Sequence, residues 1–138
     1  MKAAIRAILA LTVLCAGCGG NNTTTAPAAT STSTAGTDTF STFLAVGGSS
    51  GHAFAVSAAG TITITLTSVT PSAVVGLGVG IPGQGTSLCS LSSSVDATAG
   101  TTAQLTVPVD AGTYCVQVYD SGHVMYPGVA FSVTIVHP

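Results

Sequence analysis

The chain has 138 residues, of which only 4% are charged and 46% are hydrophobic, and its formal net charge is −2 at pH 7. Both basic residues, Lys2 and Arg6, lie near the N-terminus, so residues 18–138 carry four Asp and no Lys or Arg, a formal charge of 0 − 4 = −4. Because nucleic-acid binding draws most of its affinity from Lys and Arg contacts with phosphate, this composition excludes a nucleic-acid partner.

Residues 1–17 have the three parts of an export signal: a basic start, an apolar run over residues 7–16, and small residues before Cys18. The apolar run is too short for a transmembrane helix, which needs about 20 residues. The end of the segment resembles a bacterial lipobox, with Cys15 where Leu is usual. The resemblance implies a lipoprotein-type signal and lipidation of Cys18, and the alternative is cleavage without lipidation.

Residues 18–37 contain mainly Gly, Asn, Thr, Ala and Ser, with one Pro and no charge. Such a segment cannot bury enough apolar surface to offset the entropy lost on ordering. We therefore predict a flexible, disordered linker. With a lipidated Cys18 it would tether the following domain to a membrane of the bacterial envelope, at the outer membrane or the cell surface. Without lipidation the protein would be periplasmic or secreted.

Residues 38–138 are predicted to form one β-domain, a common domain size. Apolar residues alternate most clearly in 61–67, where Ile62, Ile64 and Leu66 would face the core and four Thr would form one outward row. The other segments with this pattern are 40–46, 53–56, 75–81, 87–91, 105–109, 114–118 and 131–135. In 75–81 we expect Ile81 to point inward. Eight or so short strands with turns between them and no helical period predict an all-β, antiparallel sandwich.

Several of these segments resemble one family. Residues 51–56, 60–66, 75–81 and, above all, 111–120, with a Gly-Thr-Tyr turn entering a strand, look like the bacterial pre-peptidase C-terminal domain. The resemblance covers most of residues 38–138. It implies a jelly-roll-like β-sandwich that acts as an accessory or binding domain without catalysis, in some members steadied by Ca²⁺. Because the four Asp of this chain form no close pair in the sequence, we expect no metal and no cofactor.

An immunoglobulin-like domain is the nearest structural alternative. Residues 110–114 resemble the corner that places a Tyr two residues before a strand cysteine. Here Cys115 follows Tyr114 directly, so in a strand it would face away from the core, whereas the immunoglobulin disulfide crosses the core. The chain also has no Trp, which that fold usually buries beside its disulfide.

Cys89 and Cys115 are the cysteines that remain in the predicted domain. Because an exported chain matures where disulfides persist, we predict that they are bonded. The closed loop of 115 − 89 = 26 residues should stabilise the fold by about 3–4 kcal/mol. The alternative, a metal site, would need further His or Cys at a suitable spacing.

The candidate ligand-binding loop lies between the last two long strands and contains Tyr119, Asp120, His123, Met125 and Tyr126. Because sandwiches often hold ligands on loop-borne aromatic residues, we expect a non-catalytic binding or accessory module with a cell-surface glycan or protein as ligand. The plain alternative is that Met125 and Tyr126 cap the core. Two other functions stay open: a small hydrolase using Asp120, His123 and a Ser, and a purely structural envelope protein.

Overall fold

The computed structural model describes residues 35–85 and 88–138. The predicted export signal, Cys18 and the linker up to residue 34 lie outside these ranges. The described residues form eight strands: β1 (Gly36–Leu44), β2 (Ser49–Val56), β3 (Gly60–Thr70), β4 (Val75–Pro82), β5 (Cys89–Ala97), β6 (Leu105–Val109), β7 (Gly112–Tyr119) and β8 (Val129–His137). Residues 35–85 and 88–138 contain no helix that could span a membrane.

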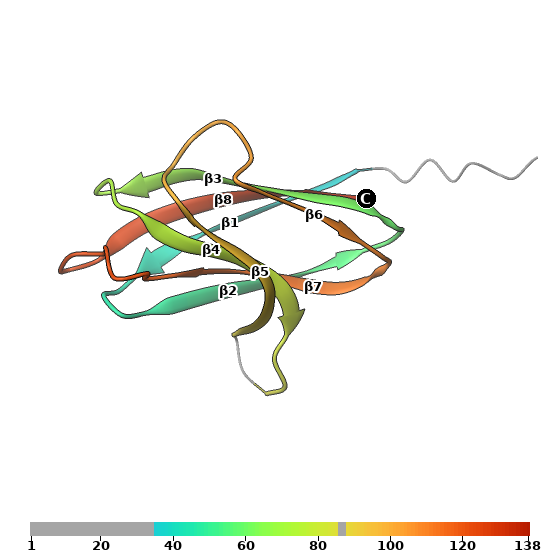
Figure 1. Ribbon diagram of the computed structural model, residues 1–138, viewed down its shortest axis with the longest axis horizontal. Helices are drawn as coiled ribbons and strands as arrows, with labels where there is room; N and C mark the ends of the chain where they lie inside the picture. The colour runs from blue at the N-terminus through green and yellow to red at the C-terminus, as the bar shows by residue number, and fades with distance from the viewer. Residues whose placement is uncertain (1–34, 86–87) are drawn as a thin grey trace, which may run out of the picture. The chain divides into compact units, whose positions relative to one another are not determined.

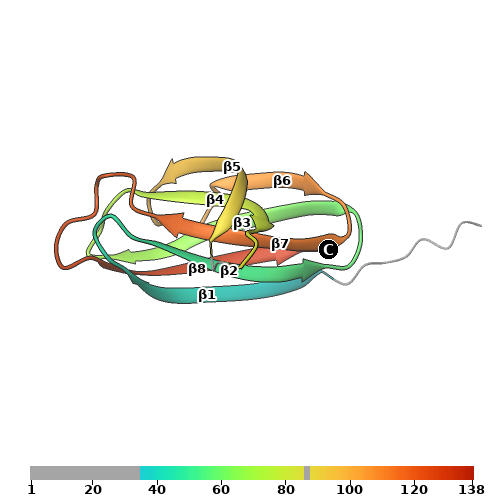
Figure 2. The ribbon, with the colours of Figure 1, turned by 90° about the horizontal axis from the view of Figure 1, so that it is seen from below.

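The strands form two four-stranded sheets that pack as a sandwich. Sheet A has the order β1-β8-β3-β6 and sheet B the order β2-β7-β4-β5, and all pairs are antiparallel. Sheet A lies above sheet B in Figure 1, and the connecting loops gather at the two ends of the strands in Figure 2. This is the strand order of a jelly roll, so the predicted all-β sandwich is confirmed.

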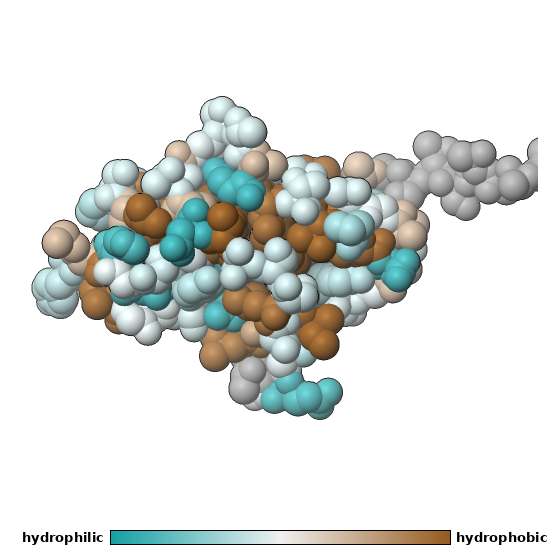
Figure 3. Space-filling view, viewed as in Figure 1, coloured by the Kyte–Doolittle hydropathy of each residue, from teal (hydrophilic) through white to brown (hydrophobic). Residues whose placement is uncertain are grey.

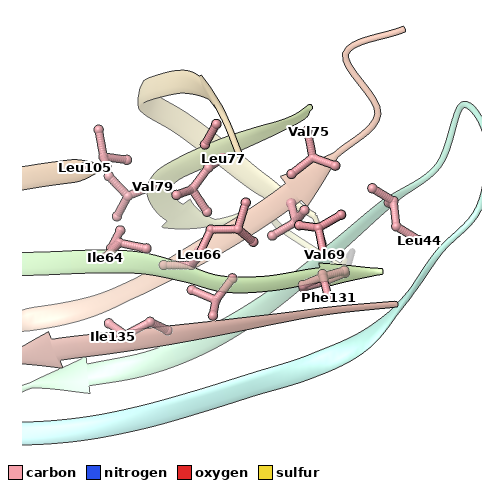
Figure 4. Close-up of a cluster of buried hydrophobic side chains, with 14 of the residues drawn as sticks. Leu44, Ile64, Leu66, Val69, Val75, Leu77, Val79, Leu105, Phe131 and Ile135 are labelled. Carbon is pink, nitrogen blue, oxygen red and sulfur yellow. The ribbon is translucent and has the colours of Figure 1, made fainter. Parts of the chain in front are cut away.

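The core lies between the two sheets, because alternate side chains of each strand point inward. Ile62, Ile64 and Leu66 in β3 are fully buried, as their alternation with Thr predicts. Figure 4 shows Ile64 and Leu66 meeting residues of β4 and β8 in one cluster, to which Ile62 also belongs. The prediction is wrong for Ile81, which is 59% exposed because it lies one residue past the last pair that joins β4 to β7.

Several strands are longer than expected, with the largest differences in β1, in β5 and in β2, which begins at Ser49 and not at residue 53. β1 runs from Gly36 and ends before a turn in which Gly47 has a φ of 67°, whereas residues 40–46 were the expected strand. β5 extends far beyond the expected 87–91, to Ala97. A bulge leaves Ser92 without a partner in β4, so the alternation of β5 changes face in mid-strand.

Three glycines form the outer face of β4, and all three are buried. The ring of Tyr119 lies over Gly76, and Leu91 lies over Gly78, where an added Cβ would come within 2.7 Å of Leu91 Cδ1. The backbone of β5 lies over Gly80. The repeated Gly in this strand therefore permits close approach of its neighbours.

The predicted disulfide between Cys89 and Cys115 is confirmed, with Cα atoms 5.9 Å apart. Cys115 is buried but lies outside the core cluster, since its neighbours in β7 supply the inward side chains. The bond therefore braces the outer face of sheet B. Tyr114 does donate a hydrogen bond to the carbonyl of Asp110 (3.1 Å), as in a tyrosine corner, but the strand order is not that of an immunoglobulin domain.

Candidate functional site

The candidate loop, residues 120–128, lies at one end of the sandwich with the β1–β2 loop (45–48) and the β3–β4 loop (71–74), at the left of Figure 1. We call this the loop end. At the other end, Gly36 pairs with His137, and we call this the terminal end. The 44 − 36 = 8 residue steps of β1, at about 3.3 Å each, separate the two ends by about 26 Å.

Asp120 organises the loop end through its carboxylate. Oδ1 accepts hydrogen bonds from the backbone N–H groups of Gly122 (2.7 Å), His123 (3.0 Å) and Val124 (3.1 Å), and Oδ2 accepts one from Gly47 (2.8 Å). The N–H groups of Gly47 and then Val124 do most to hold the pKa of Asp120 below its ordinary value, because they stabilise the charged form. Both carboxylate oxygens of Asp120 thus accept hydrogen bonds that fix the backbone of the two loops.

The same contacts join two loops that are distant in the sequence. The N–H of Asp120 donates to the carbonyl of Gly48 (3.0 Å), and the N–H of Gly48 donates to Ala45 (2.9 Å). A further turn is closed by the N–H of Gly128, which donates to the carbonyl of Met125 (2.8 Å). The β1–β2 and β7–β8 loops therefore form one hydrogen-bonded unit.

Hydrophobic side chains point outward from this unit. Met125 is 83% exposed and Tyr126 is 92% exposed, so neither caps the core. Val124, which is buried, does so instead. Phe43 at the end of β1 and Val46 in the β1–β2 loop are about half exposed, at 54% and 51%. The loop end therefore carries exposed hydrophobic side chains, while Val124 covers the core beneath them.

A small pocket of about 130 Å³ lies beside the projection. Its lining includes Pro71 and Ala73 from the β3–β4 loop and His123, Met125 and Tyr126 from the candidate loop. Sites for whole small molecules usually measure about 300–1,000 Å³, so this pocket admits a single group of a larger partner. Tyr119, the first residue of the predicted site, does not line the pocket, since its ring lies over β4.

The residues of the hydrolase alternative are brought only partly together. Ser121 Oγ lies 3.3 Å from His123 Nδ1, so these two side chains are in contact. Asp120, however, accepts from the backbone N–H of His123, and within residues 35–85 and 88–138 its carboxylate makes no hydrogen bond to the His123 ring. A relay in which an acid orients the imidazole for a Ser nucleophile is therefore not formed.

The described residues do not fit a calcium ion, the metal that the family resemblance raises. Calcium needs six to eight oxygen ligands, whereas both oxygens of Asp120 accept from N–H groups. Among residues 35–85 and 88–138, no three His, Cys, Asp or Glu side chains gather closely enough to hold a metal ion.

The structure also reveals an arrangement that sequence reasoning missed. The outward Thr row of β3 belongs to a wider face of sheet A, where Thr65 is in register with Thr134 of β8 and, through it, with Thr39 of β1. One strand further along, Thr106 of β6 pairs with Thr63. β1, β3 and β8 show alternate hydroxyl residues in the sequence and β6 has one, but only the register of the sheet brings them into common rows.

The terminal end holds a second arrangement without a sequence signal. His137 Nε2 lies 3.2 Å from Asp38 Oδ2, although the two residues are 99 positions apart. The imidazole also packs against the ring of Phe54, with ring centres 5.3 Å apart. At this end, the imidazole of His137 therefore contacts both the carboxylate of Asp38 and the ring of Phe54.

No protein-family model matches the chain, and no curated protein is similar to it in sequence. The resemblance to the pre-peptidase C-terminal domain stays a prediction that rests on the quoted segments.

Proposed function

We propose that the protein is an exported, lipid-anchored β-sandwich that acts as a non-catalytic binding module of the bacterial cell envelope. The observation that carries the proposal is the opposition of its two ends. The N-terminal segment, with the predicted lipidation site Cys18, joins the domain at Gly36, whereas Met125 and Tyr126 project from the other end. A domain tethered in this way carries its apolar loops at the end opposite the residue where the tether enters.

The loop end also supports binding over catalysis. Asp120, the one acid near His123 in the sequence, uses its carboxylate on backbone N–H groups. The neighbouring pocket is smaller than a usual small-molecule site. An accessory role is also what the resemblance to the pre-peptidase C-terminal domain implies. The partner class expected from the sequence is a cell-surface glycan or protein.

The tether is tested by intact mass spectrometry on membrane and soluble fractions of the native host, with and without reductant. We expect a mature chain that starts at an acylated Cys18 and gains two hydrogens when the disulfide is reduced. An unmodified soluble chain that starts elsewhere would contradict the anchored module and leave a secreted protein.

The binding role is tested with isolated envelopes of the host. The double variant Met125→Ser, Tyr126→Ser should bind them at least about tenfold less tightly than the parent chain, because each substitution removes an exposed apolar contact. Ile81→Ser, at an exposed apolar residue outside the loop end, is the matched control and should bind as the parent does. Retained binding of the double variant would contradict the proposed contact surface, and loss of a hydrolytic activity in His123→Ala would favour the enzyme.

A further inference from the structure

Exposed large hydrophobic residues are concentrated at the loop end. Eight such residues are found in the described part of the chain: Phe43, Val46, Ile81, Leu88, Val95, Met125, Tyr126 and Val136. Val46, Met125 and Tyr126 belong to the loop end, and Phe43 is the residue before the last of β1, which leads into it. Met125 and Tyr126 are the most exposed of the eight. In Figure 3, pale residues of intermediate hydropathy cover much of the visible face, and brown hydrophobic residues also show over the middle of the sandwich. The loop end differs in that its hydrophobic side chains lie on loops and reach the highest exposed fractions. Such clusters mark protein or membrane contacts.

The cluster is held in position before any partner binds. Asp120 ties the two loops together, and the buried Val124 lies directly before Met125 in the chain. Phe43 packs beside Gly128, where an added Cβ would come within 2.6 Å of Phe43 Cζ. Because the backbone is already ordered, binding would cost little further conformational entropy.

The charge of the domain indicates whether the apolar cluster would bind an anionic or an uncharged surface. Residues 35–138 contain no Lys or Arg, and all four Asp of the chain lie there. Residues 43–48 and 120–130 contain one Asp, Asp120, whose carboxylate accepts from four backbone N–H groups, and no Lys, Arg or Glu. An anionic surface would therefore repel the domain, since peripheral proteins bind anionic lipid through clusters of basic residues. The cluster matches an uncharged apolar surface.

The shape of the cluster favours a fluid surface. Met125 and Tyr126 project individually from a loop tip, and the pocket beside them admits only one small group. A stable protein interface usually buries about 800 Å² on each side with matched shape. A bilayer requires no matched shape, and Tyr prefers its interfacial region while apolar side chains lie deeper.

We propose that the loop end inserts Met125, Tyr126, Phe43 and Val46 into the interface of a zwitterionic lipid membrane. This inference rests on the proposed function, because it names the partner of the same contact surface. A chain anchored through Cys18 and inserted at its loop end would have two separate membrane contacts, joined through the segment that precedes Gly36 and through the domain itself.

The experiment uses the chain from Gly19 onward, which lacks the acyl site and keeps the whole described domain. Because the protein has no Trp, Tyr126→Trp supplies a single fluorescent reporter at the tip, and Ile81→Trp supplies a matched reporter on β4. With vesicles of pure phosphatidylcholine, we expect the emission of the Tyr126→Trp protein to shift to shorter wavelength and to be quenched by brominated lipid. The Ile81→Trp protein should show neither effect.

Flotation with the same vesicles measures the affinity. Met125→Ser, Tyr126→Ser should lower the partition coefficient about tenfold or more, whereas Ile81→Ser should change it less than about twofold. An equal mixture with phosphatidylglycerol should bind the parent chain less well, since the domain carries four Asp and no basic residue. Matching thermal unfolding curves for both variants would show that the fold is retained.

Three results would overturn the inference: an unshifted reporter without flotation, equal losses for both serine variants, or tighter binding to the anionic vesicles. If vesicles do not bind while host envelopes still distinguish the two serine variants, the partner is a protein or glycan. The proposed function would then stand without the membrane contact. If acylated Cys18 is absent but vesicles bind, the membrane contact would stand without the tether.

Discussion

The two ends of the sandwich use similar residues in opposite ways. Each has an Asp, a His and an exposed turn, but at the terminal end Asp38 faces the ring of His137, and Phe54 packs inward against that ring. At the loop end, Asp120 faces backbone N–H groups, and the aromatic ring of Tyr126 points into solvent. The difference lies in the partners of the side chains, since the residue types are much the same.

This contrast indicates that the residues that stabilise the fold and the residues available to bind a partner lie at different ends of the domain. Asp120 stabilises the backbone of the loops without covering any apolar side chain, so the side chains above it remain available. At the terminal end, the polar pair and the aromatic rings cover one another and leave little to contact. We therefore expect substitutions at the terminal end to alter stability and those at the tip of the loop end to alter binding.

The largest effect is expected from truncating the inward ring. Phe54 is 6% exposed and packs near Tyr114 and His137, so Phe54→Ala leaves a cavity between the sheets and should reduce the free energy of unfolding by about 3–5 kcal/mol. Tyr126→Ala removes a ring of similar size that is 92% exposed, and should change it by less than about 0.5 kcal/mol. Urea unfolding of both variants measures the contrast, and similar losses would contradict it.

The disulfide should have the next largest effect on stability and none on the contact surface. Replacing both Cys89 and Cys115 with Ser opens a loop of 26 residues, which should cost about 3.5 kcal/mol in the chain-entropy account. Thermal unfolding with and without reductant checks the change in the parent chain, and the double variant should not respond to reductant. Vesicle or envelope binding below the unfolding transition should be unchanged, because the bond lies on sheet B away from the loop tip.

The sequence predicts the strands well because alternation is a local signal. The three inward residues of β3 follow directly from the Thr residues between them, and all eight expected segments overlap observed strands. The expected strand 87–91 ends too early, because β5 has only two large apolar residues, Leu91 and Val95, and the bulge at Ser92 places them on opposite faces. A change of face depends on pairing with β4, which a local pattern does not contain.

The candidate site is predicted only in part, for a similar reason. The sequence shows a Met and a Tyr in the loop before the last strand, and in the structure Met125 and Tyr126 do lie at the surface of that loop. The role of Asp120 is not visible, because one of its partners, Gly47, is 73 residues away and contributes only a backbone N–H. Any residue type other than Pro supplies that donor, so no side-chain motif marks the contact.

Acid should loosen the loop end selectively. The lowered pKa of Asp120 means that the folded state favours its charged form. The stabilisation is therefore present above the ordinary Asp value of about 4 and is lost as the pH falls through the lower folded-state pKa. The amide protons of Gly47 and Val124 should exchange faster over that range, as measured by NMR.

Asp120→Asn tests the same contact at neutral pH. The carboxamide replaces one acceptor oxygen with an NH₂ group, which cannot accept from all four backbone donors. Exchange at Gly47 should be fast at every pH in this variant. Asp96→Asn, at an exposed residue of β5, is the control and should keep the pH dependence of the parent. Unchanged protection in Asp120→Asn would show that the loops hold together without the carboxylate.

The smallest effect is expected from the Asp38–His137 pair of the terminal end. Asp38 is 40% exposed, so solvent screens its attraction to His137, and Asp38→Asn should reduce the free energy of unfolding by no more than about 1 kcal/mol. The Asn side chain can still accept a hydrogen bond from the imidazole, which leaves the packing on Phe54 in place. Urea unfolding at low and high salt measures the charge contribution, which should shrink with salt. A loss of several kcal/mol would mean that the terminal end depends on the carboxylate as the loop end does, and the contrast between the two ends would then lie only in where their hydrophobic side chains point.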